Sequence, residues 1–106
     1  MGLFNLINRV DINKGVEEHK QHSDSVLLDV RTPDEYKEGH IPGSINIPLQ
    51  QIGQAQTVIP DKNTKIYVYC RSGSRSSQAT AYLFKVGYAD VNNIGGISNY
   101  EGEVER

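Results

Sequence analysis

The sequence predicts an α/β fold in which a mainly parallel, five-stranded sheet is flanked by helices. Three observations favour this fold class. Short apolar runs alternate along the chain with segments of helical character, one of these segments has a clear apolar face, and Gly or Pro follows several of them. No repeat or linker interrupts the 106 residues, so we interpret residues 1–106 as a single domain.

The first half of the chain contributes three expected strands and a first helix. A strand is expected at Ile7–Val10, followed by a helix over about residues 11–22 in spite of Gly15 in its interior. Val26–Val30 is a short, mostly apolar run of the kind found in buried parallel strands. Ile45–Ile47 is a third, brief strand.

Helix-capping residues stand directly after the second expected strand. The segment Thr32-Pro33-Asp34-Glu35 has the pattern of a capping box, with Thr32 at the N-cap, Pro33 at the first helical position and Glu35 reaching back to the cap. Gly39 is expected to end this short helix.

The second half of the chain has the clearest elements. Ile66–Tyr69 is a β-branched and aromatic strand, and Val91–Ile94 is the last expected strand. Between them lies an amphipathic helix that Gly87 should terminate. Its apolar positions follow the i, i+3, i+4, i+7 spacing: Ala79, Tyr82, Leu83 and Val86.

Charge and hydropathy exclude several classes of function. The formal charge of -2 argues against nucleic acid as the main partner. No apolar run approaches the roughly 20 residues that cross a bilayer, and the first residues lack the charged region and cleavage site of a secretory signal. We therefore expect no membrane partner and a cytoplasmic location.

Cys70 is the only cysteine, so the chain alone can form neither a disulfide nor a cysteine-based metal site. It follows a strand and precedes the amphipathic helix, and in parallel sheets ligands bind at this carboxyl end. The intervening loop is small and polar, with Gly in its middle, so its backbone N–H groups can turn inward as an anion-binding nest. Its candidate binding residues are Arg71, Ser72, Gly73, Ser74 and Arg75.

The loop is expected to lower the pKa of the Cys70 thiol. A free cysteine has a pKa of about 8.5, and helix N-termini and nearby arginines lower this value to about 3.5–7.5. Cys70 is therefore our candidate nucleophile, accessible and largely ionised. The plain alternative is a buried structural cysteine beside a solvated loop. Two Arg, three Ser and a Gly within six residues favour the functional interpretation.

The chain resembles the rhodanese family of thiosulfate sulfurtransferases over about residues 26–100. The family's loop Cys-Arg-x-Gly-x-Arg-Ser is matched from Cys70 to Ser76. Its Asp-Val-Arg-x-x-x-Glu-Tyr motif is matched from Asp29 to Tyr36, and its Gly-His-Ile-x-Gly-Ala/Ser motif from Gly39 to Ser44. Family members commonly carry Trp near the mouth of the site where this chain has Tyr100, which bears on substrate preference.

The resemblance implies a three-layer rhodanese-like domain that forms a persulfide on Cys70. The backbone N–H groups of residues 71–75 would surround the transferred sulfur. The partners would be a small sulfur donor such as thiosulfate and a thiol or cyanide acceptor, or a cysteine of a partner protein. No cofactor and no metal are implied.

Three other residues invite catalytic roles, but a thiolate of low pKa needs no general base. We expect Asp29 and Arg31 to form a buried ion pair that braces the sheet near the loop, and His40 to be non-catalytic. His19 and His22 look solvated, and no metal-ligand spacing surrounds them.

Two alternative functions remain open. A cysteine phosphatase or arsenate reductase of related fold would also place Cys before an Arg-closed loop, but these enzymes have five residues between Cys and Arg. This chain has four, Arg71 to Ser74, which suits a single sulfur and predicts no useful phosphatase activity. The second alternative is a non-enzymatic persulfide carrier or binding module.

Overall fold

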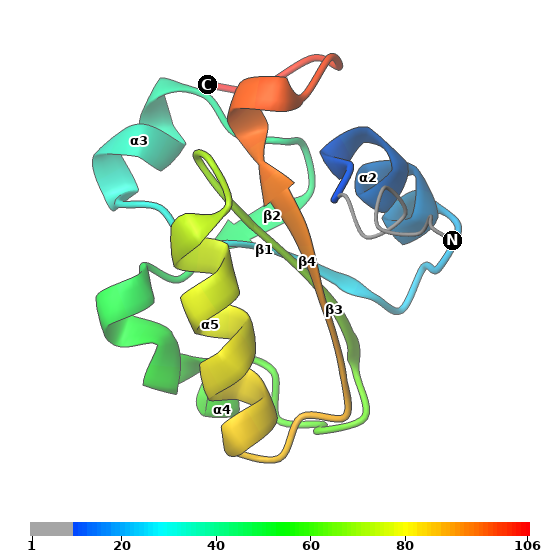
Figure 1. Ribbon diagram of the computed structural model, residues 1–106, viewed down its shortest axis with the longest axis vertical. Helices are drawn as coiled ribbons and strands as arrows, with labels where there is room; N and C mark the ends of the chain where they lie inside the picture. The colour runs from blue at the N-terminus through cyan, green and yellow to red at the C-terminus, as the bar shows by residue number, and fades with distance from the viewer. Residues whose placement is uncertain (1–9) are drawn as a thin grey trace, which may run out of the picture.

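The computed structural model describes residues 10–106, and its centre is a parallel sheet between two layers of helices (Figure 1). All three strand pairs are parallel, and the strand order is β2-β1-β3-β4. This confirms the predicted α/β fold with helices on both faces. The strands are β1 (Val26–Asp29), β2 (Ser44–Asn46), β3 (Lys65–Cys70) and β4 (Asp90–Gly96).

The prediction of five strands is wrong for the part of the chain that the structure describes, where the sheet has four. The expected first strand, Ile7–Val10, falls almost wholly outside the described residues. Val10 is not part of a strand, because it lies directly before Asp11, the residue that caps the first described helix.

The helices begin at the residues that the capping signals indicate. Asp11 accepts a hydrogen bond from the backbone N–H of Asn13, and Thr32 and Glu35 form the predicted capping box, which Gly39 follows. Among the helices described here, none has the length and apolarity to cross a membrane. The α-helices are α2 (Ile12–Lys20), α3 (Pro33–Glu38), α4 (Ala55–Val58) and α5 (Ser74–Lys85), with 3₁₀ helices at Leu49–Gln54 and Ile97–Asn99.

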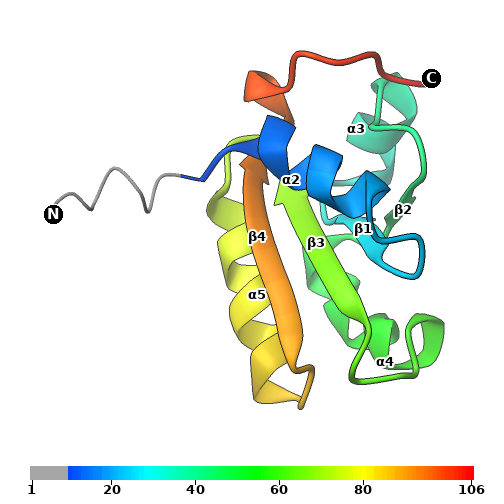
Figure 2. The same ribbon diagram turned by 90° about the vertical axis from the view of Figure 1, so that its right-hand side faces the viewer.

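The two faces of β3 bury different side chains, because successive residues of a strand point to opposite sides. Ile66, Val68 and Cys70 pack with α4 and α5, whereas Tyr67 and Tyr69 pack with α2. Figure 2 shows α2 on one side of the sheet and α4 and α5 on the other. The side chain of Cys70 therefore lies on the α5 side, at the carboxyl end of its strand.

A bulge in the pairing of β3 with β4 brings Gly95 and Gly96 opposite the last two residues of β3. Gly96 pairs with Cys70 and lies against the loop that follows it. A Cβ on Gly96 would collide with the carbonyl oxygen of Arg71 and lie 2.6 Å from the Cα of Ser72. Only glycine lets the loop approach β4 this closely, so the double glycine fixes the position of the loop.

Candidate active site

Cys70 is the last residue of β3, and the chain enters α5 only four residues later. Gly73 is the N-cap of α5 and has φ 108°, a backbone conformation that residues with a Cβ rarely adopt. The strand, cysteine, loop and helix follow one another as the sequence predicts. The loop turns back over the sulfur because Gly73 allows this reversal.

The sulfur of Cys70 is held by hydrogen bonds from the loop and from the first turn of α5. The backbone N–H of Gly73 donates to Sγ at 3.0 Å. The hydroxyl oxygen of Ser76 lies 3.4 Å from Sγ. A neutral thiol donates to this oxygen, whereas a thiolate accepts from it.

These contacts shift the pKa of the Cys70 thiol. Burial raises the pKa of the Cys70 thiol, but hydrogen bonds from the Ser76 side chain and from the backbone N–H groups of Ser76, Gly73 and Ser72 outweigh burial and lower that pKa below its ordinary value. The predicted direction of the shift is confirmed. Hydrogen bonds from the loop and the start of the helix lower this pKa, as expected for a backbone nest at a helix N-terminus.

The predicted accessibility of the thiol is wrong, because Cys70 is only 1% exposed. The loop lies over its sulfur on one side and Ala79 and Leu83 belong to the same buried cluster. A residue at the end of a buried strand stays buried unless the next segment leaves it uncovered. Here the loop after Cys70 folds back over the sulfur and covers it.

We expect alkylation of Cys70 by iodoacetamide to show a pH midpoint below the value of about 8.5 for a free cysteine. The absolute rate should be lower than that of an exposed thiolate, because the loop must open to admit the reagent. Ser76→Ala removes one of the stabilising hydrogen bonds and should raise the midpoint. A wild-type midpoint at or above 8.5 would contradict the activated thiolate.

Ser76 and Asn93 belong to the site, although the sequence assigned neither a role. The Ser76 hydroxyl is within 2.8 Å of Asn93 Oδ1 and 3.1 Å of the carbonyl oxygen of Gly73, and it has only one proton to donate. It can turn this proton to Sγ when Cys70 ionises. The loop motif contained Ser76, but nothing in the sequence distinguishes Asn93 from other polar strand residues.

The two loop arginines have different environments. The side chain of Arg71 is exposed, has no ion-pair partner within residues 10–106, and its carbonyl accepts a hydrogen bond from Ser98. Arg75 instead donates through both terminal nitrogens to the carboxylate of Glu35, at 2.8 and 3.0 Å. The exposed residues Ser72 and Ser74 complete the loop.

Asp29 and Arg31 form the predicted buried ion pair. Arg31 Nη2 lies 2.7 Å from Asp29 Oδ2, and the two residues are 5% and 0% exposed. Arg31 also donates to the carbonyl oxygen of Gly39. His40 stacks on Tyr36, with 3.7 Å between ring centroids, and lies 3.6 Å from Glu105. Arg31 thus joins the C-terminal end of α3 to Asp29 of β1, and His40 joins α3 to residue 105.

Tyr100 is half-buried and packs against the cluster on the α2 side of the sheet, which is the face opposite the Cys70 side chain. Its expected influence on substrate preference therefore stays a prediction. Within residues 10–106 no group of three metal-ligating side chains comes together.

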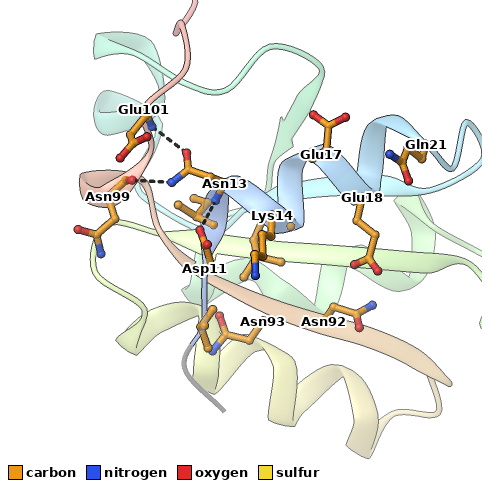
Figure 3. A pocket seen from close by; sticks show the side chains of 14 residues that line it. Asp11, Asn13, Lys14, Glu17, Glu18, Gln21, Asn92, Asn93, Asn99 and Glu101 are labelled. Carbon is orange, nitrogen blue, oxygen red and sulfur yellow. Dashed lines mark hydrogen bonds between the residues drawn. The ribbon is translucent and has the colours of Figure 1, made fainter. Parts of the chain in front are cut away.

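An open groove lies away from the loop, between α2 and the edge strand β4 (Figure 3). At one end of the groove, Asn13 of α2 connects this helix to residues 99 and 101. Its side chain donates to the carbonyl oxygen of Asn99 and accepts from the backbone N–H of Glu101. No residue from 70 to 76 lines this groove. Asn93 is the one residue of the cysteine site, as described above, that also lines the groove.

The fold and the site define a class of α/β proteins in which a cysteine of low pKa ends a parallel strand beneath the N-terminus of a helix. This chain belongs to the rhodanese-like family, because the family model described as a rhodanese-like domain matches residues 13–103.

Individual relatives support this membership. The thiosulfate sulfurtransferase PspE of Escherichia coli K12 is 42% identical over 73 residues, which are 68% of this chain and 70% of PspE. A sulfurtransferase of Allochromatium vinosum is 37% identical over 91 residues, 86% of this chain and 84% of the relative. A solved structure described as a rhodanese with anions from E. coli has a TM-score of 0.72 and 37% identity, and the match covers 77% of this chain and 98% of that one.

Proposed function

We propose that the protein is a sulfurtransferase that accepts a sulfane sulfur on Cys70 and passes it on. The observation that carries this proposal is the position of the sulfur: the Gly73 N–H donates to Sγ at 3.0 Å, and hydrogen bonding lowers the pKa of the thiol. A thiolate in such a nest is a ready nucleophile that needs no base.

With thiosulfate as donor, the Cys70 thiolate attacks the outer sulfur. A bond forms between Sγ and that sulfur while the bond between the two thiosulfate sulfurs breaks, and its electron pair leaves with sulfite. The product is a persulfide anion on Cys70. The backbone N–H groups of residues 71–75 would stabilise this anion, as those of Ser72 and Gly73 stabilise the thiolate.

The second half of the reaction transfers the outer sulfur of the persulfide to an acceptor. Cyanide would attack this sulfur to give thiocyanate and return the Cys70 thiolate. A small thiol or a cysteine of a partner protein, ionised to the thiolate, would attack the same sulfur. The sulfur would then leave Cys70 as a persulfide on the acceptor. The loop between Cys70 and Arg75 suits a single sulfur rather than a phosphoryl group. Neither half-reaction requires a cofactor, and the cytoplasmic location stays a prediction.

Intact-mass measurement tests the proposal directly. After incubation with thiosulfate, the protein should gain the mass of one sulfur atom, and cyanide should remove it with stoichiometric release of thiocyanate. Cys70→Ser is the matched control and should gain nothing. If the mass never changes, the sulfurtransferase proposal is wrong. If sulfur loads and unloads only onto a protein acceptor, the carrier alternative is correct.

A further inference from the structure

Glu35 connects two parts of the molecule that lie far apart in the sequence. Its carboxylate accepts from the backbone N–H of Thr32 at 2.9 Å, which closes the capping box of α3. The same carboxylate accepts from both terminal nitrogens of Arg75, in the first turn of α5. A negative charge is thereby placed at the edge of the cysteine loop.

The pair is only partly buried, with 29% of the Arg75 side chain and 20% of the Glu35 side chain exposed. Hydrogen bonds from Arg75 lower the pKa of Glu35 to about 2, so the carboxylate stays ionised at physiological pH. Hydrogen bonding to Glu35 and, to a smaller extent, the charge of the Cys70 thiolate raise the pKa of Arg75. At the cysteine site, the positive charge of Arg75 is therefore largely cancelled by the negative charge of Glu35.

A neutral pair has a direct consequence for anionic donors. Arg75 alone would attract a dianion more strongly than a monoanion, and Glu35 cancels most of this advantage. Both terminal nitrogens of Arg75 are also engaged, so a donor has to compete with a bidentate carboxylate for them. Arg71, exposed and without an ion-pair partner among the described residues, keeps its full charge.

We propose that Glu35 is a specificity-determining residue, which neutralises Arg75 beside the loop and so reduces the preference of the site for dianionic donors such as thiosulfate. This inference rests on the proposed function. Glu35 does not touch the reacting sulfur, and its effect passes through Arg75. The charge of the Glu35–Arg75 pair then sets how donors of different charge are ranked.

The test compares two donors that release different leaving groups after the same attack. Thiosulfate is a dianion that leaves sulfite, and methanethiosulfonate is a monoanion that leaves methanesulfinate. The measured quantity is kcat/KM for thiosulfate divided by kcat/KM for methanethiosulfonate. This ratio does not depend on the fraction of active enzyme in a preparation. Because the donors differ by one unit of charge, each unit of charge on the pair should change this ratio roughly three- to tenfold at low ionic strength.

Four proteins give a charge ladder. Glu35→Gln leaves the pair at +1, the wild type and the double variant Glu35→Gln/Arg75→Ala are at zero, and Arg75→Ala leaves it at -1. The preference for thiosulfate should be highest in Glu35→Gln, intermediate and similar in the two neutral proteins, and lowest in Arg75→Ala. Gln is suitable at this position because it also completes a capping box.

Asp34→Asn is the matched control, because Asp34 is an exposed neighbouring carboxylate in the same helical turn. It removes the same charge without releasing Arg75, so it should shift the ratio much less than Glu35→Gln. Equal ratios in all four proteins, or an equal shift from Asp34→Asn, would overturn the inference. If Glu35→Gln fails to fold, the double variant compared with Arg75→Ala still decides it, because these two proteins differ only in the charge at position 35. A wild type that takes sulfur from neither donor would instead refute the proposed function.

Discussion

Cys70→Ser should abolish sulfur transfer while the protein remains folded. Serine has nearly the size of cysteine, but its hydroxyl stays protonated near neutral pH and cannot carry a transferable sulfur. We expect cyanide-dependent thiocyanate formation to fall by about three orders of magnitude or more, to the level of a reaction without protein. The measurement is a steady-state assay with thiosulfate and cyanide at saturating concentrations.

The fold should tolerate this change because the new hydroxyl keeps polar partners. The Gly73 N–H and the Ser76 hydroxyl both lie within hydrogen-bond distance of the present sulfur. The expected loss of unfolding free energy is about 1 kcal/mol, the net worth of one ordinary hydrogen bond. Thiocyanate production by a folded Ser variant would show that the sulfur is carried elsewhere, and the mechanism would have to be abandoned.

Local signals explain why much of the fold and the nucleophile could be predicted. The capping box at Thr32 and Glu35 depends on residues three positions apart, and it forms as expected. The helix after Cys70 carries its apolar spacing in one continuous segment. Cys70 itself could be found because the strand, the small-residue loop and this helix are consecutive in the chain.

Contacts between distant segments explain what the sequence did not reveal. Arg75 and Glu35 are 40 positions apart, so their pairing depends on how α3 lies beside the start of α5. The burial of Cys70 likewise depends on Gly96 of β4, which lets the loop settle against the sheet. Neither feature has a periodic or local signature. The same holds for Asn93 of β4, whose side chain reaches Ser76 of α5 from 17 positions further along the chain.

Asp29→Asn should have the opposite outcome to Cys70→Ser, a large loss of stability with the chemistry retained. Asp29 is completely buried and accepts from the backbone N–H of Arg31 at 2.8 Å and from its guanidinium at 2.7–3.1 Å. Asparagine keeps the shape of the side chain but leaves the Arg31 guanidinium buried without a counter-charge. Removing one partner of such a pair costs about 3–5 kcal/mol, a large part of the roughly 5–15 kcal/mol that stabilises an ordinary domain.

Urea unfolding measures this loss, and the exposed ion pair between Lys65 and Asp90 supplies the control. Its nitrogen–oxygen distance is 3.1 Å and its side chains are 35% and 40% exposed, so Asp90→Asn should leave the urea midpoint almost unchanged. Replacing both Asp29 and Arg31 by apolar residues of similar size should recover much of the stability, because no unpaired charge then remains buried. Below its melting temperature, Asp29→Asn should keep kcat/KM for thiosulfate within about threefold of the wild type, since Asp29 makes no contact with the sulfur. A stable Asp29→Asn protein without activity would place Asp29 in the catalytic machinery instead, and the ion pair would no longer be explained as a brace between β1 and the end of α3.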